Sequence, residues 1–187
     1  ERINLDFFID NNKKLTINGD HKVENSWYLE LNGTLDLQAD SQLIQGVNSD
    51  LVTSAQGKIL RRQEGIASAF GYNYWRSPVG AMGASIRVDN NTLSDNPNNT
   101  DYQLNMLKKG DGNNVEFTIA NDEIVKVSTR WLYTYQNGVT YLDYDAITIN
   151  SNLESGVGYT QKWTGNPGTE QQYIFEGKPN NGTILIL

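Results

Sequence analysis

Cysteine is absent from this 187-residue chain, and histidine occurs once, as His21. Without cysteine there is no disulfide framework, no thiolate zinc site and no cysteine nucleophile. A single histidine also argues against serine–histidine–aspartate triads and against metal sites built from several imidazoles. These absences disfavour most classes of enzyme.

Long hydrophobic runs and an excess of positive charge are also missing. No apolar stretch approaches the roughly 20 residues of a membrane-spanning helix, and the N-terminus has no basic segment followed by an apolar one. Fifteen lysines and arginines stand against 22 aspartates and glutamates, giving a formal net charge of −7. Because that balance repels nucleic acids and anionic lipids, we expect no nucleic-acid partner and no membrane insertion.

Alternation of apolar and polar residues with a period of two recurs along the chain, whereas helical periodicity is hard to find. Asparagine and glycine, which favour turns, cluster between the alternating segments. The length fits one domain, or one domain and a small module. The sequence therefore predicts an all-β protein with about a dozen strands.

Short alternating segments fill residues 1–57. They lie at residues 3–9, 15–17, 29–31, 35–37 and 43–44. Units as short and closely spaced as the L-x-L pairs at 29–31 and 35–37 are typical of rungs of a stacked β-ladder or of a tight meander. We predict such a segment over residues 1–57.

Residues 58–187 are richer in aromatic side chains. Strands are predicted at residues 72–77, 115–119, 158–163, 173–176 and 183–187. The segments 128–135 and 139–144 flank Asn137-Gly138, which predicts a hairpin with a type I′ turn. Residues 89–101 contain few apolar side chains and predict a surface loop. Together these features predict an antiparallel β-sandwich of the jelly-roll type over residues 58–187.

Four spaced motifs in this second part resemble a known pattern. They are YWRSPVG at 74–80, W-x-Y at 131–133, L-x-x-G-x-G-Y at 153–159 and F-x-G-K-P-N-N-G at 175–182. The pattern resembles modules of very long cell-surface proteins of Bacteroidota, which are exported by the type IX secretion system and are associated with adhesion or gliding. Arg76 stands where serine is more usual in that group.

The resemblance implies an extracellular, cell-surface location and a non-catalytic, structural or adhesive role. The chain begins at Glu1, ends on the apolar run 184–187 and carries no C-terminal sorting domain. We therefore expect it to be a piece of a longer protein. An apolar terminal strand can add to the edge of another sheet, so residues 1–10 and 184–187 are candidates for joining neighbouring domains or subunits into a fibre.

Catalysis has little support in the sequence. A glycosidase needs two carboxylates across a cleft, one of them with a raised pKa. Several acidic residues are available, but none lies in a recognisable signature: Glu116, Asp143, Asp145, Glu170 and Glu176. We expect no catalytic residues, and hence not an enzyme.

Carbohydrate binding is the alternative function. Aromatic rings offer apolar faces that stack on sugar C–H surfaces, while nearby polar side chains bond the hydroxyl groups. The candidate ligand-binding residues are Tyr135, Tyr141, Tyr144 and Trp163, near the predicted hairpin and at the end of a later strand. Trp75 and Trp131 are expected in the core, because aromatic side chains must supply much of the interior.

No cofactor is required, but calcium is a possible ligand. β-Sandwich surface modules often bind this cation through aspartate and asparagine oxygens in loops, and Asp89, Asp95 and Asp101 fall in the predicted loop. A solvated asparagine-rich loop is the simpler explanation. Lys58, Arg61 and Arg62 fit either binding of an acidic glycan or protection of a strand edge by charge.

Overall fold

In the described part of the chain the regular structure consists of β-strands and two three-residue 3₁₀ helices, which confirms the all-β class. The computed structural model describes residues 2–3, 6–47, 49–66, 70–86, 96–120, 126–162 and 171–186. Within these residues the chain forms eighteen short strands in five sheets and two 3₁₀ helices, η1 (Leu104–Met106) and η2 (Thr129–Trp131). Neither helix is long and apolar enough to cross a membrane.

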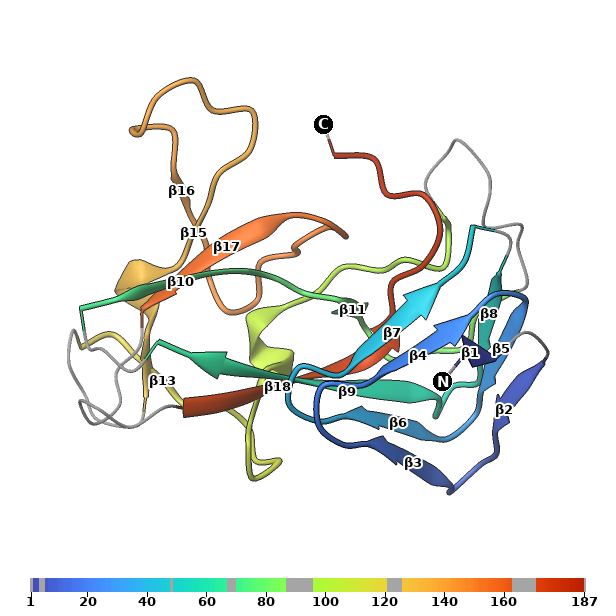
Figure 1. Cartoon of the computed structure of the whole chain (residues 1–187). Helices are drawn as coiled ribbons and strands as arrows, with labels where there is room; N and C mark the ends of the chain where they lie inside the picture. Colours follow the sequence, from blue (N-terminus) through green and yellow to red (C-terminus); the bar gives the residue numbers. More distant parts are fainter. Residues whose placement is uncertain are drawn as a thin grey trace.

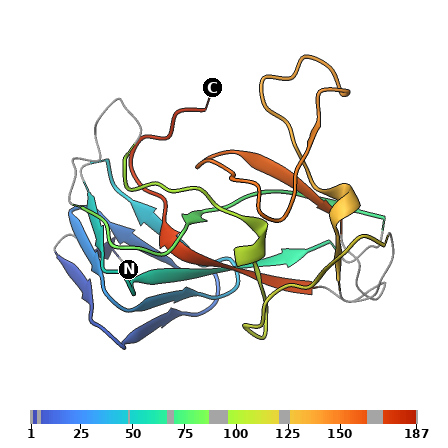
Figure 2. The same cartoon turned by 180° about the vertical axis from the view of Figure 1, so that it is seen from behind.

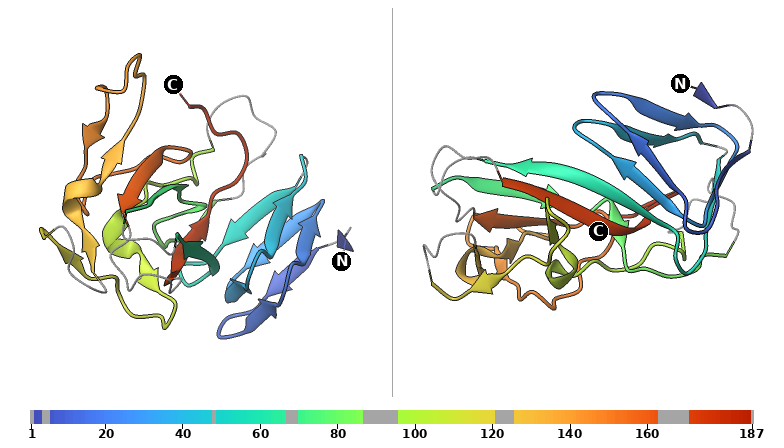
Figure 3. Two further views of the ribbon diagram at one scale, coloured as in Figure 1. Left: turned by 60° about the vertical axis from the view of Figure 1, so that its left-hand side comes forward. Right: turned by 90° about the horizontal axis from the view of Figure 1, so that it is seen from below.

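The first nine strands wind into a three-sided parallel solenoid, seen end-on in the right panel of Figure 3. Its successive coils consist of β1 (Arg2–Ile3), β2 (Phe7–Ile9) and β3 (Lys14–Ile17); β4 (Lys22–Asn25), β5 (Tyr28–Leu31) and β6 (Thr34–Leu37); and β7 (Gln42–Gln45), β8 (Asp50–Thr53) and β9 (Lys58–Gly65). Each strand of the first two coils pairs in parallel with the strand three places later, as in β3–β6–β9. Such stacking buries one continuous core along the coils.

The two L-x-L units are neighbouring sides of one coil, not successive rungs. Leu29 and Leu31 lie on β5, and Leu35 and Leu37 lie on β6. Their stacking partners are a whole coil away, since Leu35 pairs with Leu15 on one edge and with Ile59 on the other. The parallel ladder continues past residue 57 into β9, and its period is longer than the spacing of the L-x-L units.

Glycine makes the tight corner between the second and third sides. A Cβ atom on Gly33 would overlap the carbonyl oxygens of Asp10 and Lys13, and one on Gly57 would overlap the carbonyl oxygen of Leu31 in the preceding coil. Only glycine allows the backbones of two coils to approach this closely. The corner is closed by bonds between coils, with the Gly33 N–H donating to the Ile9 carbonyl and the Lys58 N–H to the Gly33 carbonyl.

Strand β9 joins the solenoid to the rest of the chain. It pairs in parallel with β6 through Lys58–Arg61 and in antiparallel fashion with β18 (Gln171–Pro179) over residues 59–65. The third side of the solenoid is thereby part of a larger sheet in the order β11–β18–β9–β6–β3, visible in Figure 1. The predicted boundary between residues 57 and 58 coincides with the start of this shared strand.

A second, antiparallel sheet faces the β9–β18 pair. It has the order β10–β17–β15–β16, formed by β10 (Tyr72–Arg76), β17 (Gly158–Lys162), β15 (Tyr133–Thr134) and β16 (Asp145–Ala146). The remaining short strands are β11 (Val79–Gly80), β12 (Lys108–Lys109), β13 (Phe117–Thr118) and β14 (Val127–Ser128). Trp75 of β10 packs edge-on against Tyr173 and Phe175 of β18, at 5.4 and 5.9 Å between ring centroids.

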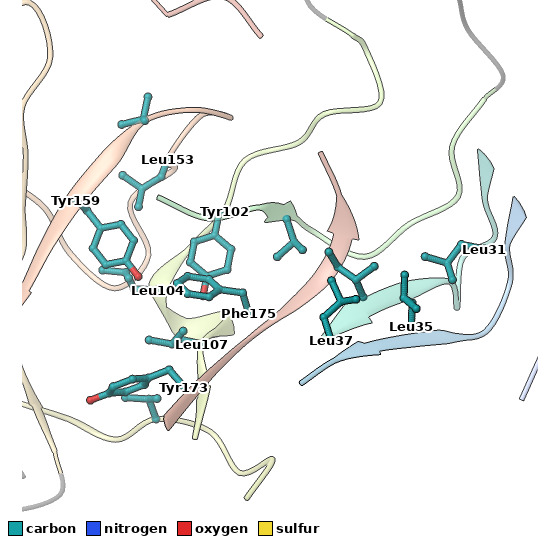
Figure 4. Close-up of a cluster of buried hydrophobic side chains, with 14 of the residues drawn as sticks. Leu31, Leu35, Leu37, Tyr102, Leu104, Leu107, Leu153, Tyr159, Tyr173 and Phe175 are labelled. Carbon is teal, nitrogen blue, oxygen red and sulfur yellow. The ribbon is translucent and has the colours of Figure 1, made fainter. Parts of the chain in front are cut away.

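One hydrophobic cluster runs through both parts of the chain, as Figure 4 shows. Leucines fill the solenoid, including the fully buried Leu29, Leu31 and Leu35. Tyrosines, leucines and Phe175 fill the space between β18 and the second sheet, where Tyr102 and Tyr173 are buried. Trp75 packs against this cluster as expected, whereas Trp131 lies half-buried at the edge of the second sheet.

Two expected strands are wrong. The hairpin of 128–135 with 139–144 does not form, because β15 returns through β16, with Tyr133 opposite Ala146. The Asp143 carboxylate instead accepts the N–H groups of Val139 and Thr140 at 2.6 and 2.7 Å, folding residues 135–144 into a protruding loop (Figure 2). Residues 183–186 form no strand, and the side chains of Ile184 and Ile186 lie beside Gly156. Most of the expected loop at 89–101 lies outside the described residues.

Candidate functional site

Two of the four candidate ligand-binding residues meet in one groove. The rings of Tyr135 and Tyr144 lie 4.8 Å apart between centroids, tilted by 48°, and each side chain remains about 40% exposed. With Tyr74 and Tyr133 they line a hollow of about 290 Å³, hereafter the tyrosine groove. Tyr74 is 70% exposed, so three ring faces of this groove are open to solvent.

The register of the second sheet explains why these tyrosines meet. Thr134 of β15 pairs with Asp145 of β16, so Tyr135 and Tyr144 are the next residues on either side of the protruding loop. Tyr74 comes from β10, whose partner β17 also pairs with β15. Tyr74 and Tyr133 both pair with Thr160 on β17, one on each edge of that strand, so their side chains lie on the same face of the sheet.

The other two candidates do not join the groove. Tyr141 is 81% exposed at the tip of the protruding loop, beside the exposed Val139 and Leu142. Trp163 lies outside the described residues. The sequence found Tyr135 and Tyr144 through their closeness to the Asn137-Gly138 turn, and Tyr141 shares that signal without sharing the site.

A second hollow of about 530 Å³, hereafter the arginine cleft, lies beside the tyrosine groove. Trp75 and Arg76 line both hollows, so the two are adjacent along β10. The arginine cleft continues along Arg61, Gln63 and Asn180 to Ile184 and Ile186 of the C-terminal segment. In Figure 1 that segment rises from the end of β18 between β7 and β17.

Positive charge marks this cleft. Arg76 is exposed, and among the described residues it makes no hydrogen bond or ion pair. The Arg61 guanidinium donates to the carbonyl oxygens of Ala39, at 2.7 Å, and of Arg62, and it meets no carboxylate among the described residues. Sequence reasoning did not select Arg76, although its place beside Tyr74 and Trp75 on one strand is an available signal.

The three basic residues of β9 have separate roles. Lys58 pairs with Glu176, Arg62 pairs with Asp36, and only Arg61 lines the cleft. Protection of a strand edge by charge is wrong for these residues, because β9 lies between β6 and β18 and is no edge. Alternation explains the difference, since neighbouring residues of a strand point to opposite faces.

Of the predicted calcium ligands, one lies in the described part of the chain. Asp101 lines a small hollow of about 200 Å³ with Asn96, Asn99 and Glu154. Asp89 and Asp95 lie outside the described residues. Among those that are described, no group of three or more histidine or acidic side chains converges. The calcium site therefore stays a prediction.

The ionisable groups with perturbed pKa values in the core are mostly tyrosines. Burial raises the pKa of Tyr102, Tyr159 and Tyr173, so their hydroxyl groups remain protonated. Neither the tyrosine groove nor the arginine cleft is lined by an aspartate or glutamate among the described residues. The pair of carboxylates that glycoside hydrolysis needs is not found in either hollow in that part of the chain.

The geometry of this site suits the binding of a ligand. Open ring faces and an unpaired guanidinium suit a ligand with apolar faces and acceptor groups. Comparison with protein-family models, with curated proteins and with solved structures finds no match to this chain.

Proposed function

We propose that this chain is a non-catalytic structural and adhesive module of a secreted bacterial cell-surface protein, joined to neighbouring modules or subunits through its first strands. The observation that carries the proposal is the open edge of the first coil. Within the described residues, β1, β2 and β3 each pair on one edge only, with β4, β5 and β6. A further coil or strand has three places to add.

The backbone of β3 shows how such an addition works. The carbonyl oxygens of Lys13 and Ile17 accept the N–H groups of Thr34 and Gln38, both at 2.9 Å. Because backbone groups alternate in direction along a strand, those of Lys14 and Thr16 point away from β6, toward the open edge. Unpaired edge groups of this kind are the template for β-augmentation.

The body behind that edge suits a load-bearing role. Leucines fill the solenoid, and the shared strand β9 ties it to the C-terminal part, for which we propose an antiparallel β-sandwich of the jelly-roll type. The secreted, cell-surface location is part of the proposal because the four aromatic and glycine motifs resemble those of type IX-secreted proteins.

Blocking the open edge tests the proposal. Thr16→Pro removes an N–H that faces away from β6, and should leave the internal pairing intact, because proline is tolerated on the free side of an edge strand. We expect the unmodified chain to self-associate with rising concentration in sedimentation equilibrium, Thr16→Ala to behave in the same way, and Thr16→Pro to remain monomeric. A chain that stays monomeric throughout would contradict assembly of subunits through this edge.

Carbohydrate binding is a second candidate, favoured by the stacked and exposed pair Tyr135 and Tyr144. Ring faces on the walls of a groove are how proteins contact the apolar faces of sugars. The tyrosine groove offers three such faces within one hollow of about 290 Å³.

A glycan array with matched tyrosine variants tests this second function. Tyr135→Ala and Tyr144→Ala should each weaken binding about tenfold, the effect of losing roughly 1.4 kcal/mol of ring contact. Tyr141→Ala removes the same side chain outside the groove and should leave binding unchanged. An array without hits, or equal losses in all three variants, would count against glycan binding at this groove.

A further inference from the structure

We propose that the tyrosine groove and the arginine cleft form one binding site for an acidic polysaccharide, a chain of sugars that carries carboxylate or sulfate groups. The inference rests on the carbohydrate-binding function proposed above and names the class of sugar. It places the sugar rings against Tyr74, Tyr135 and Tyr144, and the anionic groups against Arg76 and Arg61.

Adjacency of the two hollows gives the site its length. Trp75 and Arg76 belong to the walls of both, which places Arg76 between the tyrosines and Arg61 on the proposed path of the ligand. The tyrosine groove encloses about 290 Å³ and the arginine cleft about 530 Å³. A pocket for one small ligand spans roughly 300–1,000 Å³, so the two adjacent hollows offer room for a few sugar units.

Charge selects an anionic ligand. The whole chain carries a formal net charge of −7, with 22 acidic side chains. Nevertheless, both hollows have walls free of aspartate and glutamate in the described part of the chain, and both contain an arginine. In a protein that repels anions over most of its surface, this local reversal of charge favours anions at the cleft alone.

The guanidinium groups of Arg61 and Arg76 are available to a ligand, whereas that of the neighbouring Arg62 is not. Arg62 is bound to Asp36 through its Nε, at 3.1 Å, and its Nη2, at 3.2 Å. Arg61 is held only by backbone carbonyls, and Arg76 by no hydrogen bond among the described residues. Arginine binds carboxylate and sulfate through paired N–H donors, and an exposed guanidinium keeps all of them free.

The site combines aromatic and cationic groups, and this combination distinguishes its proposed ligand from a simple polyanion. The tyrosine rings contribute stacking that depends on the apolar face of a sugar, and the arginines contribute bonds that depend on its charge. A neutral polysaccharide satisfies only the tyrosines, and a charged polymer without rings satisfies only the arginines. The site therefore requires both features in one chain.

Titration calorimetry of the intact protein with four defined polymers tests the inference. The probes are polygalacturonate, which carries carboxylates, κ-carrageenan, which carries sulfates, neutral dextran, and polyaspartate, which has charge without sugar rings. We expect at least one acidic polysaccharide to bind more tightly than dextran and polyaspartate. Arg76→Gln should weaken that binding about tenfold, the value of one charge-assisted hydrogen bond.

Matched variants separate this inference from the function on which it rests. Lys13→Gln removes the same charge from an exposed position on the solenoid and should leave affinity unchanged. Arg61→Gln should weaken binding as Arg76→Gln does. Thermal unfolding of each variant checks that the fold is retained, and Arg76, which makes no internal hydrogen bond among the described residues, should tolerate the change.

Three results would overturn the inference. If dextran binds as tightly as the acidic polymers and Arg76→Gln leaves the affinity unchanged, glycan binding remains supported but the preference for acidic sugars is wrong. If polyaspartate binds as tightly as polygalacturonate and Tyr135→Ala leaves the affinity unchanged, the site binds charge without recognising sugar rings. Binding of none of the polysaccharides overturns both the inference and the carbohydrate-binding function.

Discussion

Asp36 is a fully buried carboxylate on a strand that otherwise buries leucine. Leu35 and Leu37 point into the solenoid, so Asp36 lies on the opposite face of β6, where long basic side chains cover it. The Lys14 Nζ lies 2.6 Å from one carboxylate oxygen, and the Arg62 guanidinium binds both oxygens. These contacts tie all three strands of the third side, β3, β6 and β9, through one charge.

Removal of this charge should be costly at neutral pH. Asp36→Asn leaves the buried parts of Arg62 and Lys14 without their anion, and breaking one partner of a buried ion pair typically costs about 3 kcal/mol. The free energy of unfolding from urea titration at pH 7 should fall by about that amount. Asp40→Asn, the same substitution at an exposed position one turn later, should change it by less than about 0.5 kcal/mol.

The pH dependence of the same measurement identifies the cause. Burial alone would raise the pKa of Asp36, but hydrogen bonds and charge from Arg62 and Lys14 outweigh burial and hold the pKa below its ordinary value. Stability from a depressed pKa is present above the unfolded value and is lost as the pH falls through the folded value. The difference between Asp36→Asn and the unmodified chain should therefore shrink below about pH 4. A difference constant from pH 7 to pH 2 would show that the loss is one of packing.

At the scale of strands, local alternation predicts where a strand lies but not what it pairs with. The segments 15–17, 29–31, 35–37 and 173–176 fall within strands of the structure, and the segment 72–77 overlaps β10. Their partners depend on residues a coil or more away, as with Leu35 and Ile59, and nothing in a period of two specifies that distance. The solenoid was therefore visible as short strands, while its three-sided winding was not.

The predicted hairpin is wrong because a side chain takes the place of a sheet partner. Asn137 has the positive φ of 53° that a type I′ turn requires, but the Asp143 carboxylate binds the following N–H groups and prevents pairing there. The candidate site was predicted only in part, because closeness in sequence reveals some of its residues and strand pairing brings in the others. Tyr135 and Tyr144 share a loop in sequence, whereas Tyr74 and Arg76 reach them only through β17.

At the scale of the molecule, the solenoid and the C-terminal part share both a strand and a core. β9 has β6 on one edge and β18 on the other, and the hydrophobic cluster passes from Leu35 and Ile59 to Phe175 without interruption. Coils of a solenoid are stabilised mainly by their neighbours, and a short stack needs a cap or a further repeat to persist. For this solenoid the cap at the C-terminal end is β18, which covers β9.

The fragment 1–57 should consequently fail to fold alone. It lacks β9, so β6 loses the partners Lys58–Arg61 and the buried Ile59, and the third side retains only β3 and β6. We expect a disordered far-ultraviolet circular dichroism spectrum for the fragment. For the full chain, we expect coincident unfolding transitions by circular dichroism and tryptophan fluorescence, because one cooperative core responds to both probes. A dispersed amide spectrum from residues 1–57 alone, or two separate transitions in the full chain, would show instead that the coils are stable without β9 and that the shared strand joins two independent units.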